Sequence, residues 1–408
     1  MSLALLQLAA LVFSIATLSP QSGDLIELER AAAANPSDVQ VQRRLAAAYE
    51  TAGRRLDAVA AWTKVTEIAP QAPAGWYALG LAYSAVSQEA IRSFDERPED
   101  AAWRQLLIAD GLLATGHLTD AFAIYRSVEA LLPSMATVHE SVAQIYERSG
   151  HASWAAQERK RDVMSAAACA TRTALCEFRA GRYRSALDAA LKGADAESRY
   201  WRARAARELA RTSYARLDKL ADSPERRAVR ATVARAEDRH QDAVTELTAA
   251  LKLAPQNPAL TFELATACYA ARNYEQALAT ISPMLQARPD DVRLVKLAGY
   301  SLLQLRRLDE ALPLLQRAAT IDPSDPGPQL ALGRVHVQRG DYAAAIPLLE
   351  PRLATDPDGS LHVQLARAYS GLGQREKAAA LLARSEELHR ASEERSAEVA
   401  RRKIEPPK

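Results

Sequence analysis

Four prolines in the second half of the chain recur at one fixed distance. Pro255, Pro289, Pro323 and Pro357 are each 34 residues apart and stand in related settings, LKLAPQNP, LQARPDDV, ATIDPSDP and LATDPDGS. A period of this length is typical of an array of small supersecondary units, because one such unit cannot bury its apolar face alone and has to stack on its neighbours. The spacing therefore predicts a stacked array rather than two or three independent globular domains.

Within each period, the order of side-chain sizes predicts two packed helices. Large–small pairs would let the first helix approach its partner closely: Leu264-Ala265, Leu332-Gly333 and Leu365-Ala366. A second small residue follows the turn, where we expect the helices to cross: Ala277, Ala311, Ala345 and Ala378. Aromatic residues make up only 6% of the chain and alanine is abundant, which favours close-packed helices over sheets.

This pattern resembles the tetratricopeptide repeat (TPR) family, whose 34-residue helix-turn-helix unit carries W, LG, Y, A, F, A and P in a fixed order. The N-terminal half carries the same residues, best in the unit of residues 39–72: Tyr49, Gly53, Ala58, Trp62 and Pro70. The resemblance covers nearly all of residues 24–390. It implies a bacterial, multi-repeat protein with an all-α fold, a right-handed α-solenoid of about eleven helical hairpins.

The regularity of the repeat suggests five regions. We expect a signal peptide or N-terminal anchor at 1–22, an N-terminal TPR array at 23–162 and a C-terminal TPR array at 224–390. Between the arrays, residues 163–223 keep a helical-hairpin texture but lose the 34-residue frame, which predicts an irregular joint. Residues 391–408 are charged on most faces and predict a capping helix and tail, which repeat arrays need at their ends.

The run from Leu3 to Leu18 is uncharged and mostly apolar. Its length suits the hydrophobic core of an export signal and falls short of the about 20 residues of a membrane span. No Lys or Arg precedes the run, so an uncleaved anchor and a packed first helix remain alternatives. We therefore expect a periplasmic or secreted protein, with membrane-anchored and cytoplasmic locations as alternatives. Any membrane contact would be made through this segment alone.

Three cysteines occur, at 169, 176 and 268, without metal-ligand spacing. If Cys169 and Cys176 lie on one helix, their Cα atoms are about 10.5 Å apart, beyond the roughly 4.4 to 6.8 Å that a disulfide spans. Small buried thiols are the favoured interpretation. An oxidised pair would require a break in the helix.

Motifs of nucleotide binding, metal ligation and nucleophilic catalysis are missing from the sequence, which contains no G-x-x-x-x-G-K-[ST], H-E-x-x-H, C-x-x-C or G-x-S-x-G. The seven histidines are scattered singly. We therefore expect no catalytic residue, no metal and no cofactor, and predict that the chain is not an enzyme.

The remaining candidate is a binding surface. The resemblance implies that the first helix of each hairpin lines a concave groove, and it places these residues there: Phe262, Tyr269, Arg293, Lys296, Tyr300, Arg334 and Arg367 in the C-terminal half, with Arg43 and Tyr77 in the N-terminal half. Aromatic and basic side chains together suit an extended peptide with acidic or C-terminal carboxylate groups. The alternative is that these side chains are only the solvated face of the array.

Charge disfavours nucleic acid as a partner. The net charge is +2, and acidic residues offset the arginine-rich, aromatic segment 199–216 that could otherwise bind RNA. The sequence therefore predicts a non-enzymatic scaffold that binds partner proteins or peptides on its concave face. Two alternatives are a structural component of an envelope export or polysaccharide-secretion machine, and an accessory subunit of a separate enzyme.

Overall fold

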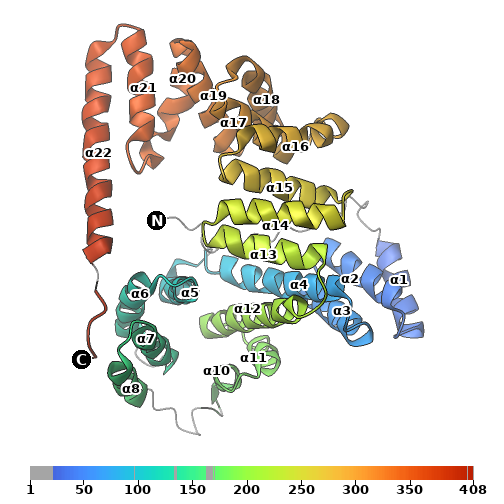
Figure 1. The fold of residues 1–408 in the computed structure, drawn as a ribbon. Helices are drawn as coiled ribbons and strands as arrows, with labels where there is room; N and C mark the ends of the chain where they lie inside the picture. The colour runs from blue at the N-terminus through green and yellow to red at the C-terminus, as the bar shows by residue number, and fades with distance from the viewer. Residues whose placement is uncertain are drawn as a thin grey trace. The chain divides into compact units, whose positions relative to one another are not determined.

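The computed structural model describes residues 22–95, 97–132, 136–161, 169, 171–401 and 403–407. All regular secondary structure in these ranges is helical, with 21 α-helices and no strand (Figure 1). The all-α fold expected from the sequence is confirmed. The predicted export segment, Leu3 to Leu18, lies outside the described residues. Among the helices that are described, none has both the length and the apolar character needed to cross a membrane.

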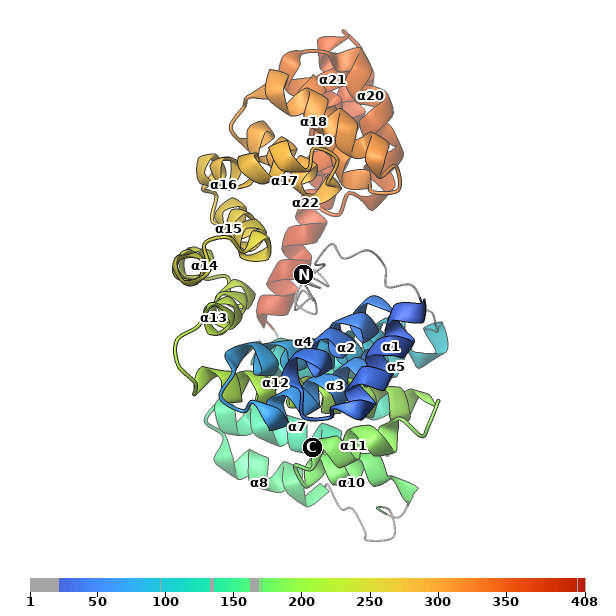
Figure 2. The same cartoon turned by 90° about the vertical axis from the view of Figure 1, so that its right-hand side faces the viewer.

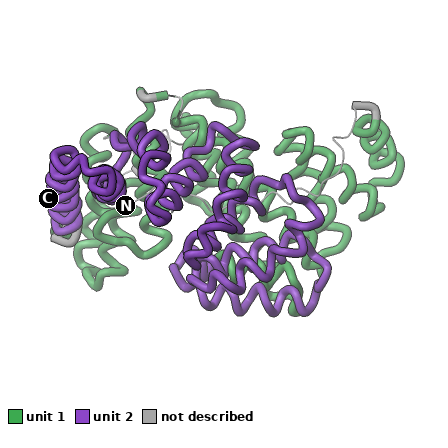
Figure 3. Tube along the Cα trace, turned by 90° about the horizontal axis from the view of Figure 1, so that it is seen from above, with its two compact units in different colours: residues 1–232, 402–408 green, residues 233–401 purple. Residues whose placement is uncertain are grey.

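The helices form two compact units, Met1–Thr232 with Arg402–Lys408, and Val233–Arg401 (Figure 3). The division falls inside helix α13 (Pro224–Ala236). It follows packing, whereas the boundaries predicted at 162 and 223 follow repeat register, so those boundaries stay a prediction.

The second unit is a regular stack of helical hairpins. Its helices are α14 (His240–Leu253), α15 (Pro258–Ala270), α16 (Tyr274–Ala287), α17 (Val292–Gln304), α18 (Leu308–Ile321), α19 (Pro326–Arg339), α20 (Tyr342–Leu349), α21 (Ser360–Gly371) and α22 (Arg375–Arg401). Each helix packs against the next, and the first helices of successive hairpins, α15, α17, α19 and α21, also touch one another (Figure 2). This nearest-neighbour packing is that of an α-solenoid.

The turns inside these hairpins repeat with the same 34-residue period. Asp238, Arg272, Arg306 and Gly340 all have positive φ, between 56° and 82°. In each case the N–H of the following residue donates to the carbonyl five residues before it, at 2.8 to 2.9 Å. This is the Schellman ending of a helix. Three of the four positions carry a side chain that is unfavourable at positive φ, so the array keeps its turn geometry without glycine.

Helix starts follow the same period. Asn257, Asp291 and Asp325 cap α15, α17 and α19 by accepting hydrogen bonds from the first backbone N–H groups. The small residues at the crossings, Ala277, Ala311 and Ala345, are fully buried. The repeat register predicted from the sequence therefore places the small residues where the helices meet.

The first unit contains α1 (Ser22–Ala34), α2 (Val39–Thr51), α3 (Arg55–Ile68), α4 (Pro73–Arg92), α5 (Ala101–Ala114), α6 (Leu118–Leu131), α7 (Ala136–Arg148), α8 (Ala152–Arg161), α10 (Thr173–Arg179), α11 (Tyr183–Ala190) and α12 (Ala196–Asp218). Helix α12 packs along α4 and also contacts α5, α10 and α11, so it joins hairpins distant in sequence (Figures 1 and 2). Gly80 of α4 lies against the Tyr214 ring, where a Cβ would clash. The Ser87 hydroxyl donates to the Ala203 carbonyl at 2.8 Å.

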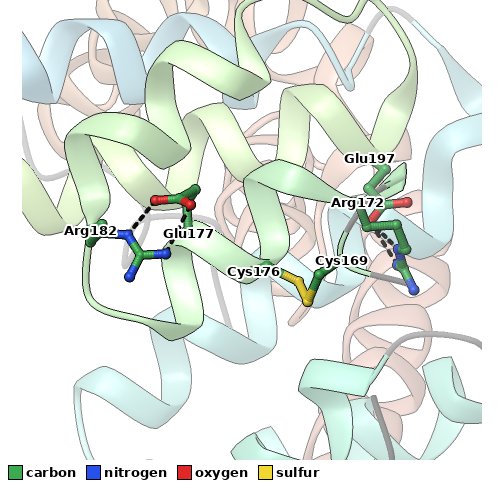
Figure 4. The surroundings of a disulfide bond; sticks show 6 residues. All are labelled: Cys169, Arg172, Cys176, Glu177, Arg182 and Glu197. Carbon is green, nitrogen blue, oxygen red and sulfur yellow. Dashed lines mark hydrogen bonds and ion pairs between the residues drawn. A yellow bond between two sulfur atoms is a disulfide. The ribbon is translucent and has the colours of Figure 1, made fainter. Parts of the chain in front are cut away.

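Cys169 and Cys176 form a disulfide, with Cα atoms 5.6 Å apart (Figure 4). The favoured expectation of two free thiols is therefore wrong for this pair. The physical reason lies at Arg172, which stands outside the helix with φ −117° and ψ 53°, so one unbroken helix does not join the cysteines. The Arg172 side chain pairs with Glu197 of α12 at 2.6 Å (Figure 4). Cys268 is free and buried.

Candidate functional site

The predicted partner-binding residues of the second unit lie on the first helices of consecutive hairpins. Helix α15 carries Phe262 and Tyr269, α17 carries Arg293, Lys296 and Tyr300, α19 carries Arg334 and α21 carries Arg367. Because α15 contacts α17, α17 contacts α19 and α19 contacts α21, the seven residues lie on a row of neighbouring helices. We call these seven residues the inner face.

The aromatic members of the inner face are half-buried. Phe262, Tyr269 and Tyr300 pack with one side against the apolar core. The Tyr269 ring meets Tyr274 edge-on at 5.4 Å between centroids. Burial, followed by the nearby Asp325 carboxylate, raises the pKa of Tyr300 to about 12. These rings therefore offer fixed, neutral surfaces for apolar groups.

The basic members of the inner face differ in what neutralises them. Arg293 pairs with Asp291 at 3.0 Å and also covers the Phe262 ring at 5.3 Å. Lys296 pairs with Asp325 at 2.8 Å. Both acids are helix caps, so the charges of α17 are engaged inside the unit.

Arg334 and Arg367 are exposed, and neither makes an ion pair within the described part of the chain. Their guanidinium groups are free to bind an anionic group. The sequence places basic residues on this face, but it does not reveal that only these two lack a carboxylate partner.

The two residues predicted in the N-terminal half belong to the first unit and are not part of the inner face. Arg43 is exposed on α2, and Tyr77 is half-buried on α4. On α4 itself, the Ser84 hydroxyl lies 3.5 Å from the Tyr214 hydroxyl of α12. This stretch of α4 is thus covered by the chain's own helix, which limits how far a groove could extend there.

The arginine-rich segment 199–216 forms most of α12, and its N-terminal half packs into the core, whereas the Arg211 side chain is 68% exposed. Tyr200 and Trp201 are each only 1% exposed, so neither ring can stack on a base. Arg204 pairs with Asp110 at 3.3 Å and lies over the Phe178 ring. These side chains stabilise the first unit rather than present a surface.

A cluster of ionisable groups joins α6, α7 and α8. Glu129, His139 and Glu158 bring ligand atoms within 4.8 Å of one another, a spacing that could hold a metal ion. Arg126 already pairs with Glu158 at 2.9 Å, and Arg161 pairs with Glu129 at 2.7 Å. A cation would have to displace both guanidinium groups, so the arrangement fits an ion-pair network better than a metal centre.

Glu158 is the buried centre of this network, with its side chain fully shielded from solvent. Burial alone would raise its pKa, but hydrogen bonds from His139 and Arg126 hold that pKa at about 2. No motif in the sequence predicts the cluster, because Glu129, His139 and Glu158 are 10 to 29 residues apart on three helices and meet only in the fold.

Comparison with known proteins identifies the repeats. The tetratricopeptide repeat family model matches residues 234–299 and 302–362. These ranges of the second unit therefore consist of tetratricopeptide repeats, which confirms the resemblance for this part of the chain. No curated protein matches the chain.

Several solved structures are similar over part of the chain. MamA (residues 41 to the end) from Desulfovibrio magneticus RS-1 is 18% identical and covers 42% of this chain and 97% of its own, with a TM-score of 0.38. MamA from MSR-1 is 21% identical and covers 41% of this chain and 95% of its own, with a TM-score of 0.36. A thermophilic TPR protein of Thermus thermophilus is 21% identical and covers 44% of this chain and 97% of its own, with a TM-score of 0.34. Similarity at this level identifies no function.

Proposed function

We propose that the chain is a non-enzymatic scaffold whose inner face binds an extended segment of a partner protein. The tetratricopeptide repeats support a protein-interaction role in general terms. The observation that carries the finer proposal is the contrast among the basic residues of the inner face. Arg293 and Lys296 are neutralised by helix caps, whereas Arg334 and Arg367 are exposed without a carboxylate.

The inner face offers a partner two kinds of contact. Phe262, Tyr269 and Tyr300 are half-buried rings against which apolar side chains can pack. Arg334 and Arg367 can donate charge-assisted hydrogen bonds to acidic side chains or to a C-terminal carboxylate. The favoured ligand is therefore an extended peptide with apolar side chains that ends in, or contains, a carboxylate.

Replacing Arg334 and Arg367 together with glutamine is expected to lower partner recovery at least tenfold, because two charge-assisted hydrogen bonds are lost. The measurement is affinity capture of the tagged full-length protein from its own cells, with quantitative mass spectrometry of the partners. Folding is safe in this variant because both side chains are exposed.

The matched control replaces Arg375 and Arg390 of α22 with glutamine, which removes the same charge from exposed positions outside the inner face. Equal loss of partner recovery in both variants would show that the partner responds only to the net charge of the protein, and would contradict the proposal.

The alternative of a rigid spacer in an export or secretion machine predicts a different result. A spacer tolerates Tyr269→Ala with Tyr300→Ala and fails when one repeat, such as 289–322, is deleted.

We also propose that the protein works outside the cytoplasm. The apolar run from Leu3 to Leu18 supports export, and the Cys169–Cys176 disulfide supports an oxidising compartment. With three cysteines and one disulfide, alkylation of the denatured, unreduced protein from its own cells should modify a single thiol, Cys268. Modification of all three thiols, with recovery in the cytoplasmic fraction, would refute export.

A further inference from the structure

The C-terminal tail of the chain contacts the first unit. Helix α22 ends at Arg401 in the second unit, whereas the tail belongs to the first. Tyr146 of α7 donates its hydroxyl hydrogen to the Glu405 carbonyl at 2.7 Å. Ile404 packs against the apolar core that includes Phe122, Val142 and Tyr146.

The tyrosine that holds the tail is oriented by groups that do not involve the tail. Its oxygen accepts a hydrogen bond from Arg126 at 2.9 Å. Arg126 is itself fixed by Glu129 at 2.7 Å and by the fully shielded Glu158 at 2.9 Å. Since Arg126 occupies the hydroxyl oxygen as a donor, the tyrosine hydrogen is free to point toward a carbonyl acceptor. The first unit thus presents a preoriented donor beside an apolar surface.

The contacts of the tail define what this surface recognises. The Tyr146 hydroxyl binds the main-chain carbonyl of Glu405, a group that every residue possesses, and the Glu405 side chain is exposed. The identity of this residue is therefore not read by the surface. Ile404 supplies an apolar side chain, and Pro406 and Pro407 follow at once. Proline keeps the residue before it extended and stiffens the segment, which lowers the entropy lost on binding. The tail thus presents a branched aliphatic residue in contact, then a residue whose side chain is exposed, then proline.

We propose that this surface, named here the tail site and centred on Tyr146 and Arg126, binds an extended aliphatic–X–Pro segment of a partner protein. The C-terminal tail occupies the site in cis and competes with that partner. One hydrogen bond and one aliphatic side chain make only a weak contact. The tail nevertheless stays bound, because its covalent link to the rest of the chain raises its effective concentration at the site to about the millimolar range. A partner segment with more contacts displaces it. The tail site lies in the first unit and does not depend on the inner face.

The test uses a fluorescein-labelled peptide of residues 399–408, VARRKIEPPK, and fluorescence anisotropy with the full-length protein. Ile404→Asp in the protein releases the tail because a carboxylate cannot stay in the apolar contact. We expect the peptide to bind this variant at least ten times more tightly than it binds the wild type. Adding Tyr146→Phe to the Ile404→Asp protein should weaken binding about fivefold, since one hydrogen bond is lost.

Two peptide controls separate recognition from charge. A peptide with the glutamate changed to alanine should bind equally well, because the Glu405 side chain is exposed. A peptide with the isoleucine changed to aspartate should not bind, although it keeps all of its basic residues. Unchanged tryptophan fluorescence and circular dichroism would show that the protein variants are folded. The proposal is overturned if the peptide does not bind the Ile404→Asp protein, or binds it and the wild type equally.

Discussion

Asp110→Ala is expected to destabilise the first unit by about 3 to 5 kcal/mol, the effect of removing one partner from a buried ion pair. The Asp110 side chain is only 3% exposed and lies 3.3 Å from Arg204. It also accepts hydrogen bonds from Tyr125 at 2.6 Å and Tyr200 at 3.0 Å. Alanine would leave the Arg204 charge without its counterion and two buried hydroxyl groups without their acceptor.

Tryptophan fluorescence during urea unfolding measures this effect in the first unit alone, because all five tryptophans lie between Trp62 and Trp201. Asp188→Ala on α11 of the same unit is the matched control. Asp188 also pairs with an arginine, Arg184, but its side chain is 57% exposed, so its loss should cost less than about 1 kcal/mol. If Asp110→Ala behaves like this control, the network around Asp110 does not hold α12 in place.

The second unit could be predicted from the sequence almost entirely, because its structure repeats with its residues. The caps Asn257, Asp291 and Asp325 share the 34-residue period of the prolines. The turn residues Arg272 and Arg306 share it too, although neither is the glycine that a turn at positive φ favours. In a solenoid each hairpin contacts only its neighbours, so local pattern and tertiary structure coincide.

The first unit could not be predicted in this way, because its decisive contacts are not local. The packing of α12 on α4 joins residues such as Ser87 and Ala203, which are 116 positions apart. Repeat period carries no information about such a pair. The disulfide escaped prediction because its geometry depends on a helix break at Arg172.

The two candidate surfaces, the inner face and the tail site, differ in the same way, since one depends on the repeat pattern and the other on a contact between distant parts of the chain. The repeat positions of the inner face are predicted from the sequence, but which of its basic residues lack a carboxylate partner depends on the capping acids Asp291 and Asp325. The tail site depends on a contact between Tyr146 and Glu405, 259 residues apart, and has no sequence signature.

Acidification is expected to weaken the first unit by about 3 kcal/mol through Glu158 alone. Its pKa is about 2 in the folded protein, where hydrogen bonds from His139 and Arg126 outweigh the effect of burial, against about 4.3 in an unfolded chain. Because folding lowers this pKa, the stabilisation is fully present above about pH 4.3 and is lost as the pH falls through 2. The difference of about 2.3 units between the folded and unfolded pKa values of Glu158 corresponds to about 3 kcal/mol of stability.

Glu158→Gln isolates this contribution from that of the other carboxylates. The variant should be less stable than the wild type by about 3 kcal/mol at pH 7, and the difference should shrink steadily between pH 4 and pH 2 as the wild-type carboxylate becomes protonated. Urea unfolding followed by tryptophan fluorescence at each pH gives both curves. Glu67→Gln on α3 is the control, since Glu67 is 58% exposed and its pairing with Lys64 should contribute little at any pH. A stability difference for Glu158→Gln that stays constant from pH 7 to pH 2 would show that Glu158 does not stabilise the fold as a charged group. In that case the ion pair of Arg126 with Glu129, at 2.7 Å, would be what holds Arg126 against Tyr146.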